Sequence, residues 1–153
     1  MARYAKNTSV SSERSRVEIE RILSRYGAGR FAYMTQEQAA MVVFEMAGKR
    51  IRFVLPLPNP NDRKFTHTGR REKQRFPEDA RAVWEQACRS SWRALVLSIK
   101  AKLETVESGI ATFEDEFLSY ILLPGNKTVG EKMLPDLNRI YETGKVPALE
   151  FKS

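Results

Sequence analysis

The side chains best suited to catalysis are few in this chain. His67 is its only histidine and Cys88 its only cysteine. A Ser-His-Asp triad would have to use His67, and no Gly-x-Ser-x-Gly sequence is present. Phosphoesterases that use two histidines need a second His-x-Thr sequence beside His67-Thr68-Gly69. These features disfavour an enzyme, and a small phosphoesterase would depend on His67 alone.

Residues that bind metals or nucleotides in known motifs are also sparse. His67 and Cys88 cannot by themselves supply the four ligands of a structural zinc site. Glu114, Asp115 and Glu116 are consecutive, so at most two share a side, and carboxylates at the start of a helix are favoured by its dipole. The chain has no Walker A motif, no Gly-x-Gly-x-x-Gly and no EF-hand loop. We therefore expect no cofactor or metal, and we expect Cys88 to pack in the core.

The charge of the chain is unevenly distributed along it. The net charge is +7, with a sequence pI of about 9.7. Residues 1–48 contain seven basic and five acidic residues, a net charge of +2. Residues 49–103 contain fourteen basic and five acidic residues, a net charge of +9. Residues 104–153 contain five basic and nine acidic residues, a net charge of −4. A basic middle third is typical of a protein that binds an anionic partner. A solvated basic surface without a partner is the alternative.

The candidate site is a set of basic residues with one aromatic residue among them. The segment 56–76 is long for a loop in a compact domain, and such loops are often functional or disordered. We expect its cations to meet those of the neighbouring strand and helix at one end of the sheet, where they neutralise phosphates while Phe65 stacks on an unpaired base. The alternative is a flexible, solvated loop. The predicted nucleic-acid-binding residues are Arg50, Arg52, Arg63, Lys64, Phe65, Arg70, Arg71, Lys73, Arg89 and Arg93.

The longest predicted element is a helix over 77–109. Pro77 suits its first position, Glu78 and Asp79 complement the positive end of the dipole, and Gly109 is a natural left-handed end. Apolar residues recur every three or four positions between these ends. On this helix Arg89, Arg93 and Lys100 fall within about 40° of one another. The helix would be roughly 45 Å long, and we expect the rest of the chain to pack along it.

The residues before this helix predict one helix and an antiparallel sheet. A helix begins within 11–15, capped by Ser11, Ser12 or Ser15, and ends at Gly27. Three strands follow over 30–35, 39–46 and 50–55, and a short fourth strand is possible over 64–68. Phe31 and Tyr33 are expected in the core, although they could stack on bases if their face of the sheet were open.

The residues after it predict two further helices. One begins at Thr112, with Phe113, Phe117, Leu118, Tyr120 and Ile121 on its core side. The other is capped by Thr128 and Glu131, contains Pro135, which should kink or shorten it, and ends at Gly144. The expected fold class is α+β: an N-terminal helix, a three-stranded antiparallel meander packed on one long helix, and a C-terminal helical hairpin. We expect a flexible arm over 1–10 and a single domain over 11–153, with 56–76 a long basic loop.

Four segments of the chain are distinctive: RYGAGRFAY, RIRFVLPLPNPNDRKFTHTGRRE, WRALVLSIKAKLETVESGIATFEDEFLSYILLP and TVGEKMLPDL. Together they resemble a widespread family of small bacteriophage and prophage proteins. The resemblance covers nearly the whole chain; it implies a phage context and supplies no site residues. The order of elements is similar to that of single-strand annealing proteins of phage recombination, and also to that of double-stranded-RNA-binding domains.

These observations predict a non-enzymatic phage protein that binds nucleic acid, with single-stranded DNA in replication or recombination favoured. The alternative is an inhibitor of a host defence or host enzyme that binds a protein or a signalling nucleotide. No apolar run approaches the roughly 20 residues of a membrane-spanning helix. A lone cysteine favours a reducing compartment, here the cytoplasm of a bacterial host. The chain could form a homo-oligomer, with Trp92 or Phe117 at an interface as readily as in a core.

Overall fold

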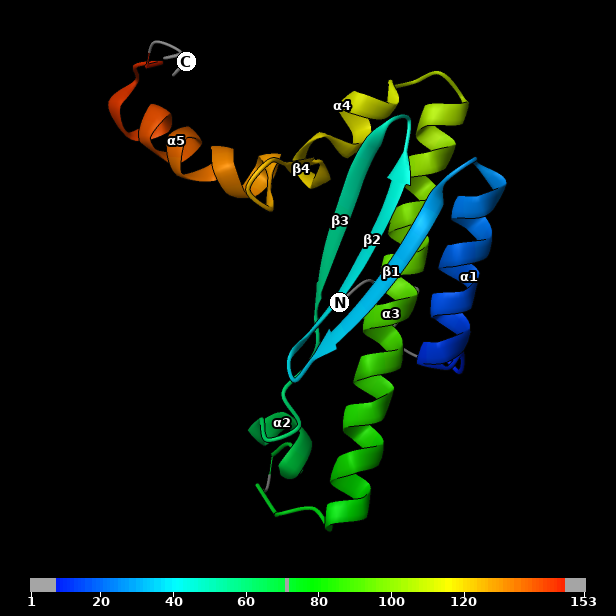
Figure 1. Cartoon of the computed structure of the whole chain (residues 1–153). Helices are drawn as coiled ribbons and strands as arrows, with labels where there is room; N and C mark the ends of the chain where they lie inside the picture. The colour runs from blue at the N-terminus through cyan, green and yellow to red at the C-terminus, as the bar shows by residue number, and fades with distance from the viewer. Residues whose placement is uncertain (1–7, 71, 148–153) are drawn as a thin grey trace.

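The long helix is the element on which the fold is built, as the sequence predicts. The computed structural model describes residues 8–70 and 72–147. Helix α3 covers Pro77–Glu107, with Pro77 in its first turn and Gly109 in the left-handed region just past its end. A three-stranded antiparallel sheet and helix α1 (Ser12–Arg25) lie along α3 (Figure 1). The predicted α+β class is confirmed.

Helix α1 begins with a serine cap. Ser11 is the N-cap, and its hydroxyl accepts a hydrogen bond from the backbone N–H of Arg14 at 3.2 Å. This bond satisfies one of the N–H groups that a helix start leaves unpaired. Of the three serines that could cap this helix, Ser11 therefore does so, while Ser15 is fully buried inside the helix.

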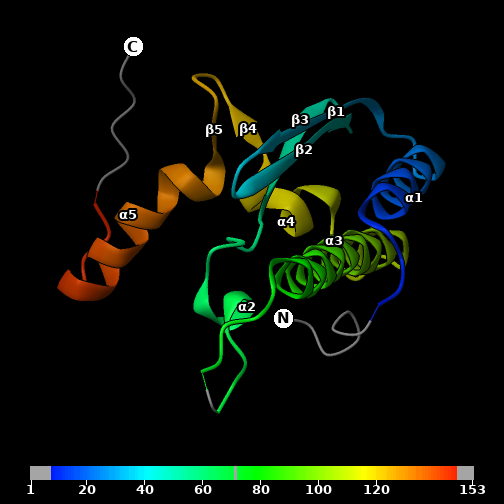
Figure 2. The ribbon, with the colours of Figure 1, turned by 90° about the horizontal axis from the view of Figure 1, so that it is seen from below.

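The sheet consists of β1 (Gly29–Gln36), β2 (Ala39–Met46) and β3 (Lys49–Pro56), in the order β1-β2-β3. Ala47 and Gly48 connect β2 to β3, both with positive φ, as the favoured two-residue hairpin turn requires. Helices α1 and α3 lie on the same side of the sheet (Figure 2). The other face of the sheet has neither helix on it.

The core lies between the sheet and the two helices. Val42, Phe44, Ile51 and Phe53 from the strands are buried there with the apolar faces of α1 and α3. Phe117 joins them from the C-terminal part, with its ring centroid 6.4 Å from that of Phe44 and 6.3 Å from that of Phe53. Phe31 and Tyr33 are partly buried and pack against this core, as expected, so they are not available to stack on bases. Trp92 is likewise buried, at 4% exposure.

The segment between β3 and α3 is folded into a small lobe, which we define as residues 57–70 and 72–76. It contains helix α2 (Arg63–Thr66) in place of the possible short strand over 64–68, and an isolated bridge between His67 and Gln74. The Arg75 guanidinium donates to the carbonyl oxygens of Lys64 at 2.9 Å and Phe65 at 2.8 Å. These long-range bonds stabilise a helical turn that local sequence does not predict.

The C-terminal part is helical but interrupted. Helix α4 covers only Phe113–Phe117 and is followed by the 3₁₀ turn η1 (Leu118–Tyr120), so the predicted second helix is shorter than expected. Leu118 is 51% exposed and does not belong to the core side assigned to it. A two-stranded ribbon of β4 (Leu122–Leu123) and β5 (Lys127–Thr128) then leads to α5.

Helix α5 covers Val129–Thr143. The Thr128 hydroxyl accepts from the N–H of Glu131 at 3.2 Å, and Gly144 ends the helix with a left-handed backbone, both as predicted. Pro135 lies within the helix and does not shorten it. No helix in the described part of the chain is long and apolar enough to cross a membrane.

Candidate nucleic-acid interface

A groove lined by several cations lies between α1 and α3. Its volume is about 580 Å³. The two helices run in the same direction, because Glu18 of α1 pairs with Arg93 of α3, and Tyr26 pairs with Glu104 about two to three turns further along both. We call this surface the basic groove. It is lined by Val10, Glu13, Arg14, Val17, Glu18, Arg21, Ile22, Arg25, Tyr26, Arg93, Lys100 and Glu104.

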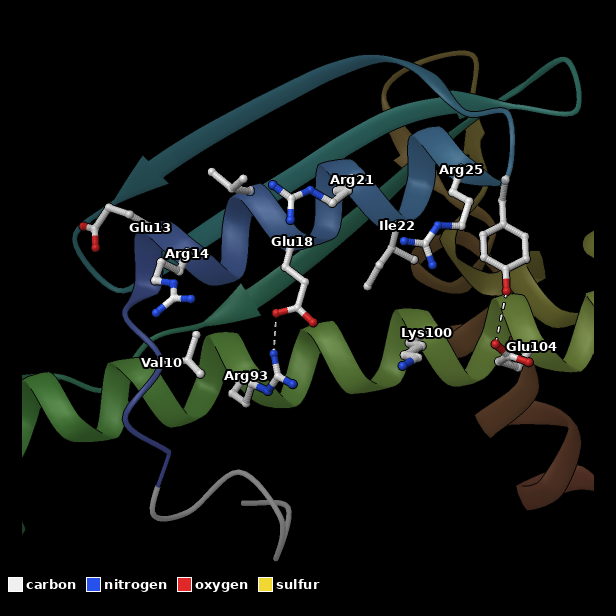
Figure 3. Close-up of a pocket in the computed structure, with 12 residues that line it drawn as sticks. Val10, Glu13, Arg14, Glu18, Arg21, Ile22, Arg25, Arg93, Lys100 and Glu104 are labelled. Carbon is white, nitrogen blue, oxygen red and sulfur yellow. Dashed lines mark hydrogen bonds and ion pairs between the residues drawn. The ribbon is translucent and has the colours of Figure 1, made fainter.

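The α1 side of the basic groove presents a row of three arginines. Arg14, Arg21 and Arg25 are spaced by seven and four residues, which places them on one side of a helix. All three are exposed, and Figure 3 shows them following one another along α1. Among the described residues, none of them has an ion-pair or hydrogen-bonding partner for its guanidinium. At 1.5 Å per residue the row is about 16 Å long.

The α3 side adds Lys100, which is exposed and also unpaired within the described ranges. Four cations of the basic groove are thus free to bind an anion. Two of the three carboxylates in the lining are already engaged: Glu18 binds Arg93 at 2.5 Å, and Glu13 lies 3.6 Å from Arg16 outside the groove. The local field is therefore positive.

Two contacts between the helices fix the shape of the groove. The Glu18–Arg93 pair spans it between Arg14 and Lys100, nearer the end at Val10 (Figure 3). At the other end the Tyr26 hydroxyl donates to Glu104 at 3.2 Å. Desolvation raises the pKa of the Tyr26 phenol, and the bond to the Glu104 carboxylate raises it further, so Tyr26 remains a hydrogen-bond donor at neutral pH. Val17 and Ile22 supply apolar surface between the cations.

The predicted site residues do not form one surface. The turn before β3 and the lobe after it lie at opposite ends of that strand, about 23 Å apart over seven residue steps of 3.3 Å. The expectation that the cations of β3 and of 56–76 meet at one end of the sheet is therefore wrong. The nine predicted residues that the structure describes are divided among β3, the lobe and the middle of α3.

The two arginines of β3 are engaged in ion pairs on the outer face of the sheet. Arg52 binds Glu131 at 2.5 Å and donates to the carbonyl of Asn126 at 3.2 Å; its side chain is only 10% exposed. Arg50 lies 3.6 Å from Glu45. The bond from Arg52 lowers the pKa of Glu131. Arg52 thus connects α5 to the sheet and is not free to bind a phosphate.

The aromatic residue of the lobe is also unavailable. Phe65 is 4% exposed, so the stacking role expected for it conflicts with its burial. Lys64 lies over its ring, with the ammonium nitrogen 5.0 Å from the ring centroid, and Arg63 binds Glu72 at 3.0 Å. The cations of the lobe that remain exposed without a partner among the described residues are Arg70 and Lys73. Arg71 lies outside the described residues.

Of the two predicted arginines on α3, one lines the basic groove. Arg93 contributes to its wall through the bond to Glu18. Arg89 lies one turn earlier and binds the side-chain oxygen of Gln86. Of the three α3 cations that the sequence places on one side of the helix, Arg93 and Lys100 line the groove and Arg89 does not. The sequence prediction missed Arg14, Arg21 and Arg25, although their spacing of seven and four residues on a predicted helix was visible.

The residues considered for catalysis do not assemble into a site. The His67 ring nitrogen Nδ1 contacts the hydroxyl of the adjacent Thr66 at 2.8 Å. Cys88 is half-buried on α3, and burial raises the pKa of its thiol. Within 8–70 and 72–147, no three His, Cys, Asp or Glu side chains come together in a way that could hold a metal ion.

A scan against protein-family models and searches of curated proteins and of solved structures found no match for this chain. The function must therefore be argued from the basic groove itself.

Proposed function

We propose that this protein binds single-stranded nucleic acid along the basic groove and does so without catalysing a reaction. The observation that carries the proposal is the set of four exposed, unpaired cations that line the groove: Arg14, Arg21, Arg25 and Lys100. Guanidinium and ammonium groups neutralise phosphates and release condensed counterions, which gives affinity without reading sequence. A solvated basic surface would not need these groups to share one concavity.

The form of the groove favours one strand over a duplex. Packed helices have axes about 8–10 Å apart, so the depression between them is narrow. A sugar–phosphate backbone can follow such a depression, with its phosphates near the cations on either wall. The row on α1 is about 16 Å long, which matches roughly five nucleotides at the 3.4 Å spacing of stacked bases.

The apolar part of the lining suits the remaining parts of a nucleotide. Val17 is exposed between Arg14 and Arg21, and the Tyr26 ring lies at the end of the groove beside Glu104. Aromatic rings stack on bases of any sequence, so Tyr26 takes the role that the sequence suggested for Phe65. The setting that we propose is a phage, which the sequence resemblance implies, and within it replication or recombination, which the similar order of elements in single-strand annealing proteins suggests.

The direct test is fluorescence anisotropy with a labelled 20-nucleotide single strand and the corresponding duplex, each at 50 and 200 mM salt. Four phosphate contacts on a single strand predict a slope of about −2.8 in log K against log salt, or an affinity loss of about fiftyfold. Tighter binding of the single strand with this slope supports the proposal. Tighter binding of the duplex would contradict strand selection, and no binding at 50 mM would contradict the proposal as a whole.

A further inference from the structure

The outer face of the sheet is unusually apolar for a surface exposed to solvent. An antiparallel sheet with one open face normally alternates apolar and polar residues, whereas a strand with a nearly continuous apolar run is typical of burial on both faces. Strand β2 reads AAMVVFEM. Paired in register across the outer face are Met34, Met41 and Val54; the neighbouring row consists of Ala32, Val43 and Arg52, the last of which is paired with Glu131. Met34 is 57% and Val54 47% exposed.

Helix α5 carries a second uncovered apolar face. Its apolar residues lie on one side of the helix and its charged residues on the other, as the spacing of three and four predicts. No residue of α5 is buried. The exposed fractions of its large apolar side chains are 46% for Met133, 55% for Leu134, 44% for Leu137 and 84% for Tyr141.

The chain does not cover one of these faces with the other. The start of α5 is held against η1, where a Cβ on Gly130 would come within 2.9 Å of the Ser119 carbonyl oxygen, and against β3 by the Arg52–Glu131 pair. From there α5 extends away from the sheet (Figures 1 and 2). The two faces are therefore left open in a single copy.

We propose that the apolar face of α5 packs on the outer sheet face of a second copy of this chain, reciprocally, in a two-fold dimer. The dimensions agree: α5 is about 22 Å long, and a strand of eight residues about 26 Å. The charges also suit a protein surface better than a membrane. A helix that lies on anionic lipid is rich in Lys and Arg, whereas α5 has three carboxylates, on Glu131, Asp136 and Glu142, and two cations.

The area indicates that the exchange must be reciprocal. At about 200 Å² for a large side chain, the exposed fractions give roughly 450 Å² for the α5 face and roughly 200 Å² for Met34 and Val54 on the sheet face. A single contact would then bury about 650 Å², less than a stable interface needs, whereas two contacts related by a two-fold axis would bury about 1,300 Å².

Cross-linking between two differently tagged copies tests the contact. In a Cys88→Ser background, one copy carries Leu137→Cys and the other Met34→Cys, and the two are co-expressed and treated with a short bismaleimide. We expect a covalent heterodimer. In the matched control, Arg139→Cys on the charged side of α5 replaces Leu137→Cys and should give at least tenfold less product.

Light scattering on size-exclusion fractions gives a second, independent measurement. The wild-type chain at about 100 µM should have the mass of a dimer. Leu134→Glu/Leu137→Glu should weaken association at least a hundredfold, while the circular dichroism spectrum stays unchanged. Lys132→Glu/Arg139→Glu, on the other side of α5, should leave the dimer intact.

Each other outcome would overturn the proposal. A monomeric mass for the wild-type chain excludes the dimer, and a larger ring excludes reciprocal exchange. Cross-links between two Leu137→Cys copies alone would indicate that α5 packs on α5. A cross-link within one chain carrying both cysteines would indicate that α5 folds back on its own sheet.

Discussion

Replacing Arg21 and Arg25 by glutamine removes two of the four unpaired cations from the basic groove. Both side chains are exposed and have no partner in the described part of the chain, so the fold should be unaffected. If the groove binds phosphates, both the affinity and its dependence on salt must fall, because each neutralised phosphate contributes its own released counterions.

The size of the effect follows from the number of contacts. At about 0.7 per contact on a single strand, four contacts give a slope near −2.8 and two give a slope near −1.4. Between 50 and 200 mM salt, the wild-type chain should lose about fiftyfold in affinity and the variant only about sevenfold. If the electrostatic contribution vanishes near 1 M salt, the variant should bind about sixtyfold more weakly than the wild type at 50 mM.

The assay is anisotropy of a labelled 20-nucleotide single strand over a salt series. The matched control is Arg70→Gln/Lys73→Gln, which removes the same charge from exposed positions of the lobe. We expect that control to keep the wild-type slope. An unchanged slope in Arg21→Gln/Arg25→Gln would refute the groove as the phosphate site. Equal losses in both variants would mean that net charge, rather than the groove, determines binding.

Three further predictions concern stability. Ser15→Ala should raise the free energy of unfolding by about 1 kcal/mol, because the buried Ser15 hydroxyl has no hydrogen-bonding partner in the described residues; urea unfolding measures it, and a decrease would contradict the reasoning. Phe117→Ala should cost about 3–5 kcal/mol in the same assay, against no more than about 0.5 kcal/mol for the exposed Leu118→Ala. Glu131 has a pKa below its ordinary value in the folded chain because Arg52 donates to it, so its contribution to stability is complete above the unfolded pKa and is lost as pH falls through the folded one. Glu131→Gln should therefore lose less stability than the wild type between pH 7 and pH 3, and identical losses would contradict this assignment.

The elements that could be predicted from the sequence are those with local signals at both ends. Helix α3 carries Pro77 at its start and Gly109 past its end, and the structure places it at Pro77–Glu107. Strand β2 was predicted with its observed bounds, since the Ala47-Gly48 turn follows it directly. Helix α2 could not be predicted in this way, because it depends on the contact of Arg75 with carbonyl groups about ten residues earlier.

The candidate site was predicted less well than the fold, for a reason that concerns ion pairs. Counting cations along the sequence treats each cation as free to bind a ligand. When a cation is paired with a carboxylate, the carboxylate neutralises its charge and occupies its hydrogen-bond donors, so it attracts an anionic ligand only weakly. Arg52 and Arg93 are paired with Glu131 and Glu18, which lie 79 and 75 residues away in the chain. Such pairs are invisible before the fold is known. By contrast, Arg14, Arg21 and Arg25 have no ion-pair partner within residues 8–70 and 72–147, although they belong to the segment with the smaller basic excess.

The proposed dimer and the proposed groove use different sides of the molecule, and this separation makes a last prediction possible. The dimer contact uses the outer face of the sheet and α5, whereas the basic groove belongs to the helices on the opposite side of the sheet (Figure 2). Both grooves of a dimer therefore remain open. A strand long enough to reach both would bind the second groove at a high effective concentration, which raises affinity without any new contact.

Leu134→Glu/Leu137→Glu should consequently leave the affinity for a strand of about six nucleotides unchanged, because such a strand occupies one groove. The same variant should lose at least tenfold in affinity for a strand of about 60 nucleotides, because a monomer cannot engage two grooves at once. Anisotropy with the two lengths, at a protein concentration where the wild type is dimeric, separates the two proposals. Loss of binding to the short strand would show that α5 contributes to the nucleic-acid site itself. Equal affinities of wild type and variant for the long strand would show that the two grooves act independently.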